Sequence, residues 1–202
     1  MKTIIIILAI SAILFFIFQA FVLRATSGTE THAYKVLNDY GSFDVRQYEP
    51  ALFSYVVMKS DSYKSTSSQG FRQLAGYIFG GNDKSQKIEM TSPVAMTMED
   101  SVTMKFKIPE GMSLDQMPKP SNSAVRFRSE PEKVVAAIRF GGWSTDERIA
   151  EYTQKLKELL AEKGIEHNGN FSYLGYNPPY ELINRKNEII VELSTQEPLK
   201  EK

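Results

Sequence analysis

Two histidines, His32 and His167, are the residues of this 202-residue chain best suited to ligate a metal. One imidazole is enough to hold a haem iron as an axial ligand, but a multi-histidine metal centre needs more imidazoles than this chain has. Both histidines stand in polar stretches that are typical of surface loops. The sequence therefore favours solvated loop positions for both and assigns no metal ligand, with His167 as the remaining candidate for one.

Methionines and carboxylates offer two other kinds of chemistry. Met90 and Met96 are flexible, polarisable side chains that could form a wall for a flat apolar ligand or could fill the core. Glu188 and Glu192 are candidates for a buried acid in a cleft, where a raised pKa would mark a functional group. The alternative for these carboxylates is a structural ion pair.

Two cations and one tryptophan complete the candidates. Arg185 and Lys186 precede the last predicted strand and could pair with a carboxylate or propionate of a ligand, or form a solvated turn with a structural ion pair. Trp143 is the only tryptophan. We expect it to pack where a helix starts, and stacking on a ligand is the second interpretation.

Several function classes are excluded by what the chain does not contain. Cysteine is absent, so thiolate ligands, cysteine nucleophiles and disulfides are excluded. The 24 basic and 24 acidic residues leave no net charge that would attract nucleic acid. There is no Gly-rich phosphate loop, no nucleophile elbow and no His-Glu-x-x-His motif. We therefore expect a binding protein that has no catalytic residues and no nucleic-acid partner.

An apolar stretch at Ile4–Leu23 predicts a helix that spans a membrane. About 20 apolar residues match the ~30 Å hydrocarbon layer, whereas the apolar part of a signal peptide is usually ~7–15 residues long. We therefore favour a single-pass signal anchor within residues 1–23 over a signal peptide cleaved after Ser27. The short N-terminal tail favours an extracytoplasmic domain, on the periplasmic side in a bacterium, whereas cleavage would give a secreted protein.

The rest of the chain is predicted to form a polar linker (residues 24–33), one folded domain (34–195) and a tail (196–202). The first half of the domain contains strand patterns at Tyr34–Tyr40, Phe43–Tyr48, Ala51–Met58 and Val102–Ile108, and a helix that Ser67 or Ser68 caps and Gly80-Gly81 ends. The clearest strand is Val102–Ile108. Its alternation of apolar residues with Thr103, Lys105 and Lys107 predicts one buried face and one solvated face.

The second half of the domain repeats this order of elements. It contains strand patterns at Val125–Arg128, Val134–Phe140, Phe171–Tyr176 and Glu188–Leu193, and a helix that begins with a Ser144-Thr145-Asp146-Glu147 capping box. We therefore predict an α+β fold: a twisted, barrel-like antiparallel sheet built from a duplicated strand–strand–helix–strand–strand unit, with two helices, in addition to the N-terminal helix.

Seven short motifs make residues 34–193 resemble the SOUL haem-binding protein family. In chain order they are Tyr34–Tyr48 with its Val-Arg-x-Tyr-Glu ending, Tyr77–Asn82 (YIFGGN), Ile88–Val94 (IEMTSPV), Phe106–Pro109 (FKIP), Phe140–Gly142 (FGG), Gly175–Pro179 (GYNPP) and Arg185–Glu188 (RKNE). The resemblance implies a twisted antiparallel barrel with two helices, built from a duplicated unit. It agrees with the fold that the residue patterns predict.

The resemblance also implies a ligand, haem or another porphyrin, held without turnover on an apolar surface that includes the first helix of the domain. Ser68 and Gly76 stand where relatives are thought to carry basic residues, so Arg72 or Lys84 would have to pair with the propionates. Neither histidine lies within a matching motif. The implied cofactor-binding residues are Phe71, Arg72, Leu74, Ala75, Ile78, Met90 and Met96.

Two other hypotheses remain open on the sequence alone. The duplicated architecture also resembles effector-binding domains of the gyrase-inhibitor type, which hold amphipathic or cationic small molecules near a buried acid, and some of whose relatives hydrolyse small substrates. Glu188 or Glu192 would supply that acid here. The third hypothesis is an anchored interaction scaffold with no ligand.

Overall fold

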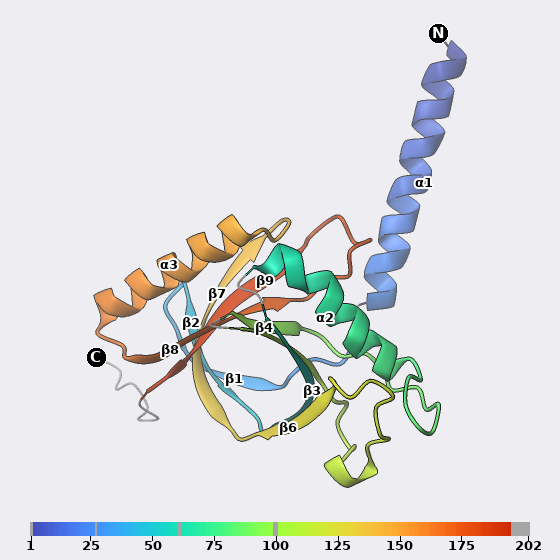
Figure 1. The fold of residues 1–202 in the computed structure, drawn as a ribbon. Coiled ribbons are helices and arrows are strands. Elements are labelled where there is room, and N and C mark those ends of the chain that lie inside the picture. Colours follow the sequence, from blue (N-terminus) through green and yellow to red (C-terminus); the bar gives the residue numbers. More distant parts are fainter. Residues whose placement is uncertain (1, 27, 60–61, 99–100, 195–202) are drawn as a thin grey trace.

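A computed structural model describes residues 2–26, 28–59, 62–98 and 101–194. The described part consists of a long N-terminal helix, α1 (Lys2–Thr26), and a curled α+β domain from which this helix projects, as Figure 1 shows. The predicted tail, residues 196–202, lies outside the described residues. β1 begins at Tyr34, where the sequence predicted that the domain starts.

The described strands form one nine-stranded antiparallel sheet in the order β1-β2-β7-β9-β8-β4-β5-β3-β6. In chain order the strands are β1 (Tyr34–Asp39), β2 (Asp44–Tyr48), β3 (Ala51–Met58), β4 (Val94–Met98), β5 (Val102–Lys107), β6 (Arg126–Glu130), β7 (Lys133–Gly141), β8 (His167–Gly175) and β9 (Lys186–Leu193). A short 3₁₀ helix, η1 (Leu114–Gln116), lies in the connection between β5 and β6.

The strand order confirms the predicted duplication. The first unit is β2, β3, α2 (Tyr63–Ile78), β4 and β5, and the second is β6, β7, α3 (Asp146–Lys163), β8 and β9. The strands β2, β3, β4 and β5 of the first unit correspond to β6, β7, β8 and β9 of the second. When each strand is replaced by its counterpart, the order of the eight strands across the sheet reads in reverse. The two units are therefore related by an approximate two-fold axis that passes between β4 and β8.

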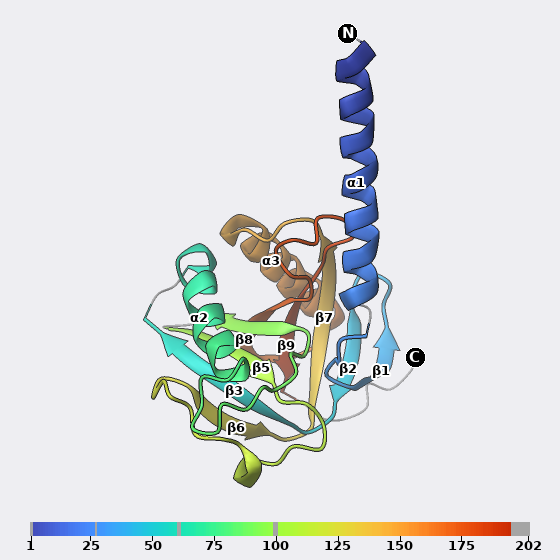
Figure 2. The same ribbon diagram turned by 90° about the vertical axis from the view of Figure 1, so that its right-hand side faces the viewer.

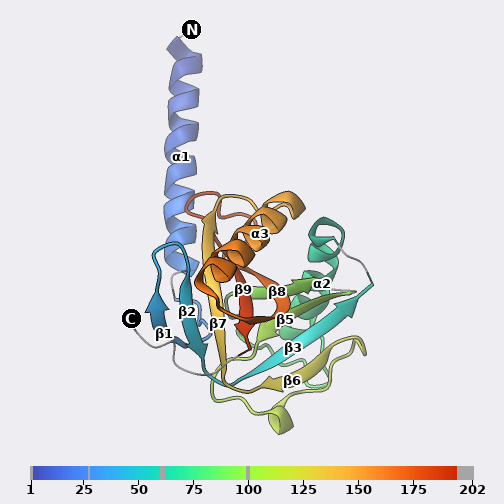
Figure 3. The ribbon, with the colours of Figure 1, turned by 90° about the vertical axis from the view of Figure 1, so that its left-hand side faces the viewer.

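The two domain helices cover the same face of the sheet. α2 packs on β3 and β5, and α3 packs on β7 and β9, as the three views of Figures 1, 2 and 3 show. Successive side chains of a strand point to opposite faces, so every second residue of these strands lies under a helix. Met104 and Phe106 of β5 and Ala136 and Ile138 of β7 are such residues, and all four are buried in one core.

Both helix starts differ from the prediction. α2 begins four to five residues earlier than the proposed Ser67 or Ser68 caps, because the Ser62 hydroxyl accepts a hydrogen bond from the amide of Ser65. α3 is capped by Thr145. Ser144, the predicted capping residue, instead lies 2.6 Å from the hydroxyl of Tyr173.

The predicted linker is attached to the domain along much of its length. Glu30 forms an ion pair with Lys107, and its carbonyl accepts a hydrogen bond from the amide of Ser92. Thr31 forms a bridge with Ser92. Residues 28–33 therefore add to one side of the sheet and do not form a free tether.

Candidate functional site

The predicted binding face on α2 is mostly core. Leu74 is completely buried, and Ile78 of the same helix and Met96 of β4 are 2% and 1% exposed. Ala75 is also buried. These four side chains hold α2 against the sheet, so in this structure they present no wall to a ligand.

Three predicted site residues remain within reach of solvent. Phe71 is half-buried, with its ring centroid 5.4 Å from that of Phe106, and Met90 is half-buried against the core. Arg72 is exposed. Contact between these residues and a ligand stays a prediction.

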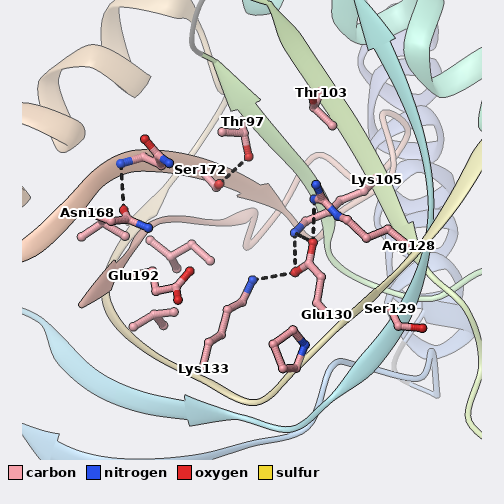
Figure 4. Close-up of a pocket in the computed structure, with 15 residues that line it drawn as sticks. Thr97, Thr103, Lys105, Arg128, Ser129, Glu130, Lys133, Asn168, Ser172 and Glu192 are labelled. Atoms are coloured by element: carbon pink, nitrogen blue, oxygen red, sulfur yellow. Dashed lines mark hydrogen bonds and ion pairs between the residues drawn. The ribbon is translucent and has the colours of Figure 1, made fainter. Parts of the chain in front are cut away.

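A larger hollow opens on the face of the sheet that the helices do not cover. It has a volume of about 450 Å³ and lies within the curl of the sheet, as Figure 4 shows. We call it the cleft. Its lining includes Thr97, Thr103, Lys105, Arg128, Glu130, Lys133, Val135, Asn168, Asn170, Ser172, Ile190 and Glu192, from β4 to β9.

β5 explains how the sequence builds this cleft, and it corrects one prediction. The alternating polar residues of β5 were predicted to face solvent, but Lys105 and Lys107 are only 9% and 5% exposed. The strand alternates as predicted, yet the sheet curls so far that its polar face lines a cavity. Sequence alternation identifies the two faces of a strand but not the curvature of the sheet around them.

A cluster of four charged residues forms the most polar wall of the cleft. We call Lys105, Arg128, Glu130 and Lys133 the cleft cluster. The Nζ of Lys105 lies 2.6 and 2.8 Å from the two carboxylate oxygens of Glu130, Lys133 lies 2.6 Å from one of them, and Arg128 lies 2.7 Å from the other. Three cations share one carboxylate, which leaves a surplus of two positive charges in the cluster.

The pKa values of the cluster follow from this arrangement. Burial alone would raise the pKa of Glu130, but the attraction of Lys105 and Lys133 outweighs it and lowers this pKa to about 2. Burial and the repulsion of Lys133 lower the pKa of Lys105 to about 8, because its share of one carboxylate does not offset them. The carboxylate is therefore held as an anion, and Lys105 loses its proton more easily than an ordinary lysine.

A smaller recess of about 40 Å³ adjoins the cleft and contains His32. Its walls share Lys105 and Lys133 with the cleft. His32 was predicted to be solvated, but it is half-buried, with its ring centroid 4.6 Å from that of Tyr48 and 5.5 Å from that of Phe53. Burial lowers the pKa of His32, and its Nε2 lies 2.7 Å from the carbonyl oxygen of Glu49. The prediction was wrong because the preceding residues are fastened to the sheet.

Glu188 forms a structural ion pair and is not an unpaired acid. Its side chain is fully buried, and its two oxygens accept hydrogen bonds of 2.9 and 3.1 Å from the guanidinium of Arg46. Tyr176 donates a hydrogen bond of 2.6 Å, and Arg139 lies 3.1 Å away on the neighbouring strand. Burial would raise the pKa of Glu188, but Arg46 and Tyr176 lower it below its usual value. The raised pKa that an effector-type acid would require is absent at Glu188, whereas Glu192 lies exposed in the lining of the cleft.

The remaining candidates lie away from the cleft. His167 begins β8, where a loop was predicted, and its Nδ1 accepts a hydrogen bond of 3.1 Å from the amide of Gly169. Trp143 was predicted to pack where a helix starts; it stands two residues before the Thr145 cap of α3 and is 53% exposed. The guanidinium of Arg185 lies 4.2 Å from the centroid of the Trp143 ring, and Arg185 is half-buried and not part of the cleft lining. Within the described residues, no group of three or more His, Asp or Glu could hold a metal ion.

Sequence reasoning missed the cleft cluster. Its members come from β5, from β6 and from the start of β7, and a strand that is distant in sequence brings the first two together: β3 lies between β5 and β6. The only available signal was Lys105 on the polar side of β5 and the Ser129-Glu130-Pro131 turn. Neither residue indicates its partner without the strand order.

Comparison with known proteins gives a family match that spans the domain. A family model described as SOUL heme-binding protein matches residues 29–192. "Heme-binding protein 2" of Homo sapiens is 32% identical over 190 residues, which cover 88% of this chain and 92% of that protein. "Heme-binding protein 2" of Mus musculus is 32% identical over 158 residues, covering 74% and 77%, and "Heme-binding protein 1" of Xenopus laevis is 25% identical over 156 residues, covering 73% and 82%.

Solved structures of low sequence identity share the fold. The C-terminal domain of EcmrR superposes with a TM-score of 0.59 at 7% identity, covering 80% of this chain and 98% of that domain. A hydrolase from Listeria innocua superposes with a TM-score of 0.55 at 9% identity, covering 85% and 96%. These likenesses concern the fold alone, whereas the sequence matches extend over nearly the whole domain. The chain belongs to the SOUL haem-binding protein family.

Proposed function

We propose that this protein is a membrane-anchored binding protein for haem or another porphyrin, which it holds in the cleft without turning it over. Family membership supports the class of ligand, because relatives with 32% identity carry the name heme-binding protein. The structural observation that supports the site is the surplus of positive charge that the cleft cluster holds within a hollow of about 450 Å³.

The cleft suits a porphyrin in size and charge. Its volume lies within the ~300–1,000 Å³ range of small-molecule pockets. Arg128 and Lys133 both point to Glu130 but keep 50% and 18% of their side chains exposed, so they can also meet an incoming carboxylate. Val135 and Ile190 supply apolar lining on the neighbouring strands. Glu192, in the same lining, reduces the surplus charge of the whole cleft to one.

In this proposal the propionates of the porphyrin pair with Arg128 and Lys133, because guanidinium and ammonium groups bind carboxylates by charge-assisted hydrogen bonds. Burial of the macrocycle against the apolar lining contributes about 25 cal/mol per Å² of apolar area removed from water, less the free energy lost on association. Bound haem would supply an iron centre, and no residue of the described chain is assigned to ligate it.

Neither histidine is well placed to serve as an axial ligand. His32 lines the recess of about 40 Å³, which is too small to admit a macrocycle, and His167 is not part of the cleft lining. We therefore propose that the macrocycle and its propionates, and not the iron, determine affinity. Metal-free protoporphyrin IX should then bind about as tightly as haem.

The α2 surface is the competing site for the same ligand. There Phe71, Arg72 and Met90 remain accessible in part, but Leu74 and Ile78 would have to leave the core before they could touch a macrocycle. Buried large apolar side chains are costly to expose. The cleft needs no such rearrangement, so the geometry favours the cleft.

A lipophilic cation is a poor match for this cleft. A protein with the same fold, SAV2435, has been solved bound to tetraphenylphosphonium, and it superposes on this chain with a TM-score of 0.50 at 7% identity. In the present chain three cations face the cleft, and the buried acid Glu188 is paired with Arg46. The charges here therefore favour an anionic ligand.

The anchor is part of the proposal. Lys2–Arg24 within α1 is long and apolar enough to cross a membrane, and only 6% of its most apolar window is buried in the protein. A soluble core helix would be mostly buried, so the exposure of α1 supports a span or a signal segment. We propose a single-pass anchor with the domain on the extracytoplasmic side.

Two double variants of the full chain distinguish the cleft from the α2 surface. Arg128→Met with Lys133→Met removes the surplus charge and leaves the Lys105–Glu130 ion pair intact. Arg72→Met with Lys84→Met removes the two exposed cations that the sequence proposed as partners of the propionates. Each variant is titrated with haemin by Soret absorbance and with protoporphyrin IX by fluorescence, in nonionic detergent.

We expect the cleft variant to bind both porphyrins about tenfold more weakly, a loss of ~1.4 kcal/mol, and the α2 variant to bind like the parent protein. Equal binding by the cleft variant together with weakened binding by the α2 variant would move the site to α2. A parent protein that gives no saturable change with either porphyrin would refute the proposed function.

A further inference from the structure

The connection between β8 and β9 makes an unusual contact with the N-terminal helix. We call residues 177–185 the β8–β9 loop. Gln19, a polar residue inside the apolar stretch of α1, is 2% exposed. Its Nε2 donates a hydrogen bond of 3.2 Å to the carbonyl of Tyr180, and its Oε1 accepts one of 2.9 Å from the amide of Leu182. Both polar ends of the Gln19 amide are therefore satisfied by the backbone of this loop.

The loop follows α1 further toward the domain. The hydroxyl of Thr26 lies 3.3 Å from the carboxylate of Glu181, which is buried. Val22 of α1 is buried as well. Figures 1 and 2 both show this loop reaching the domain-proximal part of α1.

The bonds from the loop to Gln19 use only its backbone, and two of its large apolar side chains remain exposed. Tyr180 is 56% exposed and Leu182 is 44% exposed. Arg185 holds the loop in shape from inside, through the carbonyls of Asn177, Pro178 and Glu181. The loop thus presents two large apolar side chains on a braced backbone.

The position of Gln19 sets the depth of this loop. Gln19 precedes Leu23, the last residue of the apolar stretch, by four residues, which is about 6 Å along a helix at 1.5 Å per residue. If that stretch fills the hydrocarbon layer, the backbone of residues 180–182 lies below the boundary of the layer. Exposed Tyr and Leu side chains at that depth meet lipid and not water, and tyrosine is enriched at membrane interfaces.

We propose that the β8–β9 loop inserts Tyr180 and Leu182 into the membrane interface and so fixes the domain against the bilayer. This inference rests on the proposed membrane anchor and goes beyond it, because an anchor alone would not place any part of the folded domain in the bilayer. Polar groups inside a membrane are expensive unless paired, and the loop supplies the partner that Gln19 needs there. The partner surface is the lipid bilayer itself, continuous with the span of α1.

The absence of cysteine from the chain allows a direct test in the full-length protein. Single-cysteine variants Tyr180→Cys and Leu182→Cys are labelled with an environment-sensitive nitrobenzoxadiazole dye and reconstituted into phosphatidylcholine vesicles that contain nitroxide-labelled lipid. Leu114→Cys is the matched control, since Leu114 is an equally exposed apolar residue (54%) in η1, within the β5–β6 connection. Ile13→Cys, in the middle of α1, reports on the anchor itself.

We expect the dye at positions 180 and 182 to emit at shorter wavelength than at 114 and to be quenched several-fold more strongly by nitroxides near the headgroups. The inference would be overturned, and the anchor retained, if deep nitroxides quenched the dye at position 13 while the dye at positions 180 and 182 showed the same emission and quenching as the dye at position 114. No quenching at 13 would refute the anchor, and the inference with it.

A second pair of variants tests the role of Gln19. Gln19→Leu removes both side-chain hydrogen bonds to the loop, whereas Ser11→Leu changes another polar residue of α1 that is exposed. We expect Gln19→Leu, but not Ser11→Leu, to reduce the quenching of a dye at position 182. Equal quenching in both variants would show that Gln19 does not hold the loop at this depth.

Discussion

Leu74 provides the sharpest test of whether the α2 face is core or binding surface. Its side chain is completely buried between α2 and the sheet. Replacement by alanine removes three carbon atoms, which lowers the hydrophobic stabilisation by ~2.4 kcal/mol at ~0.8 kcal/mol per carbon. A residual cavity of a few tens of Å³ adds about 1 kcal/mol at ~24 cal/mol per Å³. We therefore expect Leu74→Ala to lower the free energy of unfolding by about 3–4 kcal/mol.

Urea unfolding of the full chain in detergent measures this loss, and porphyrin titration of the folded variant measures binding. We expect the porphyrin affinity of folded Leu74→Ala to remain that of the parent, because the cleft lies on the other face of the sheet. The control is Phe79→Ala: Phe79 follows α2 directly and is 61% exposed, so its loss should change stability by less than ~0.5 kcal/mol.

The opposite pattern would refute this reasoning. If Leu74→Ala lowered stability by less than about 1 kcal/mol and weakened porphyrin binding several-fold, Leu74 would contact the ligand. The α2 face would then open in solution, and the binding residues implied by the family resemblance would be the correct ones.

Two further predictions concern titration and iron ligation. The pKa of Glu130 is about 2 in the folded protein against a usual value of 4.5. Ionised Glu130 therefore adds about 3 kcal/mol to the free energy of unfolding. This stabilisation is complete above pH 5 and is lost as the pH falls toward 2. Unfolding free energies measured from pH 6 to pH 3 should therefore decline more steeply in the parent than in Glu130→Gln, and parallel curves would contradict the assigned pKa. Replacing His32 and His167 together with alanine should leave the affinity for haem nearly unchanged, and loss of a low-spin Soret spectrum in either single variant would identify an axial ligand.

The fold was largely predictable from the sequence because its local signals agree with one another. The alternation in β5, the turn residues between strands and the repeated order of elements led to a duplicated α+β sheet, which the strand order confirms. The errors lie at element ends. Several serines precede Phe71, and composition alone does not show that Ser62 is the one whose hydroxyl reaches a free amide.

The candidate site was less predictable, because its position depends on curvature and on contacts between distant segments. Apolar spacing on α2 correctly identified a face at Leu74 and Ile78, but spacing cannot distinguish a face that meets a sheet from one that meets a ligand. The charges of the cleft cluster are each unremarkable in sequence. They come together only because β3 pairs with both β5 and β6 and the curl of the sheet encloses them.

The approximate two-fold symmetry of the domain allows two of its charge clusters to be compared. β5 and β9 are equivalent strands of the two units, and Lys105 and Glu188 lie on them. In the second unit the charge of Glu188 is closed off by Arg46, Tyr176 and Arg139. Beside Lys105 of the first unit, the carboxylate of Glu130 comes from β6 of the second unit and is outnumbered by cations, two of which keep part of their side chains in solvent. Glu188 is also surrounded by three cations, Arg46, Arg139 and Lys186, so surplus positive charge does not distinguish the two clusters. The cleft cluster lines the hollow of about 450 Å³, whereas Glu188 does not, and for that reason we propose the cleft cluster as the site for an anionic ligand.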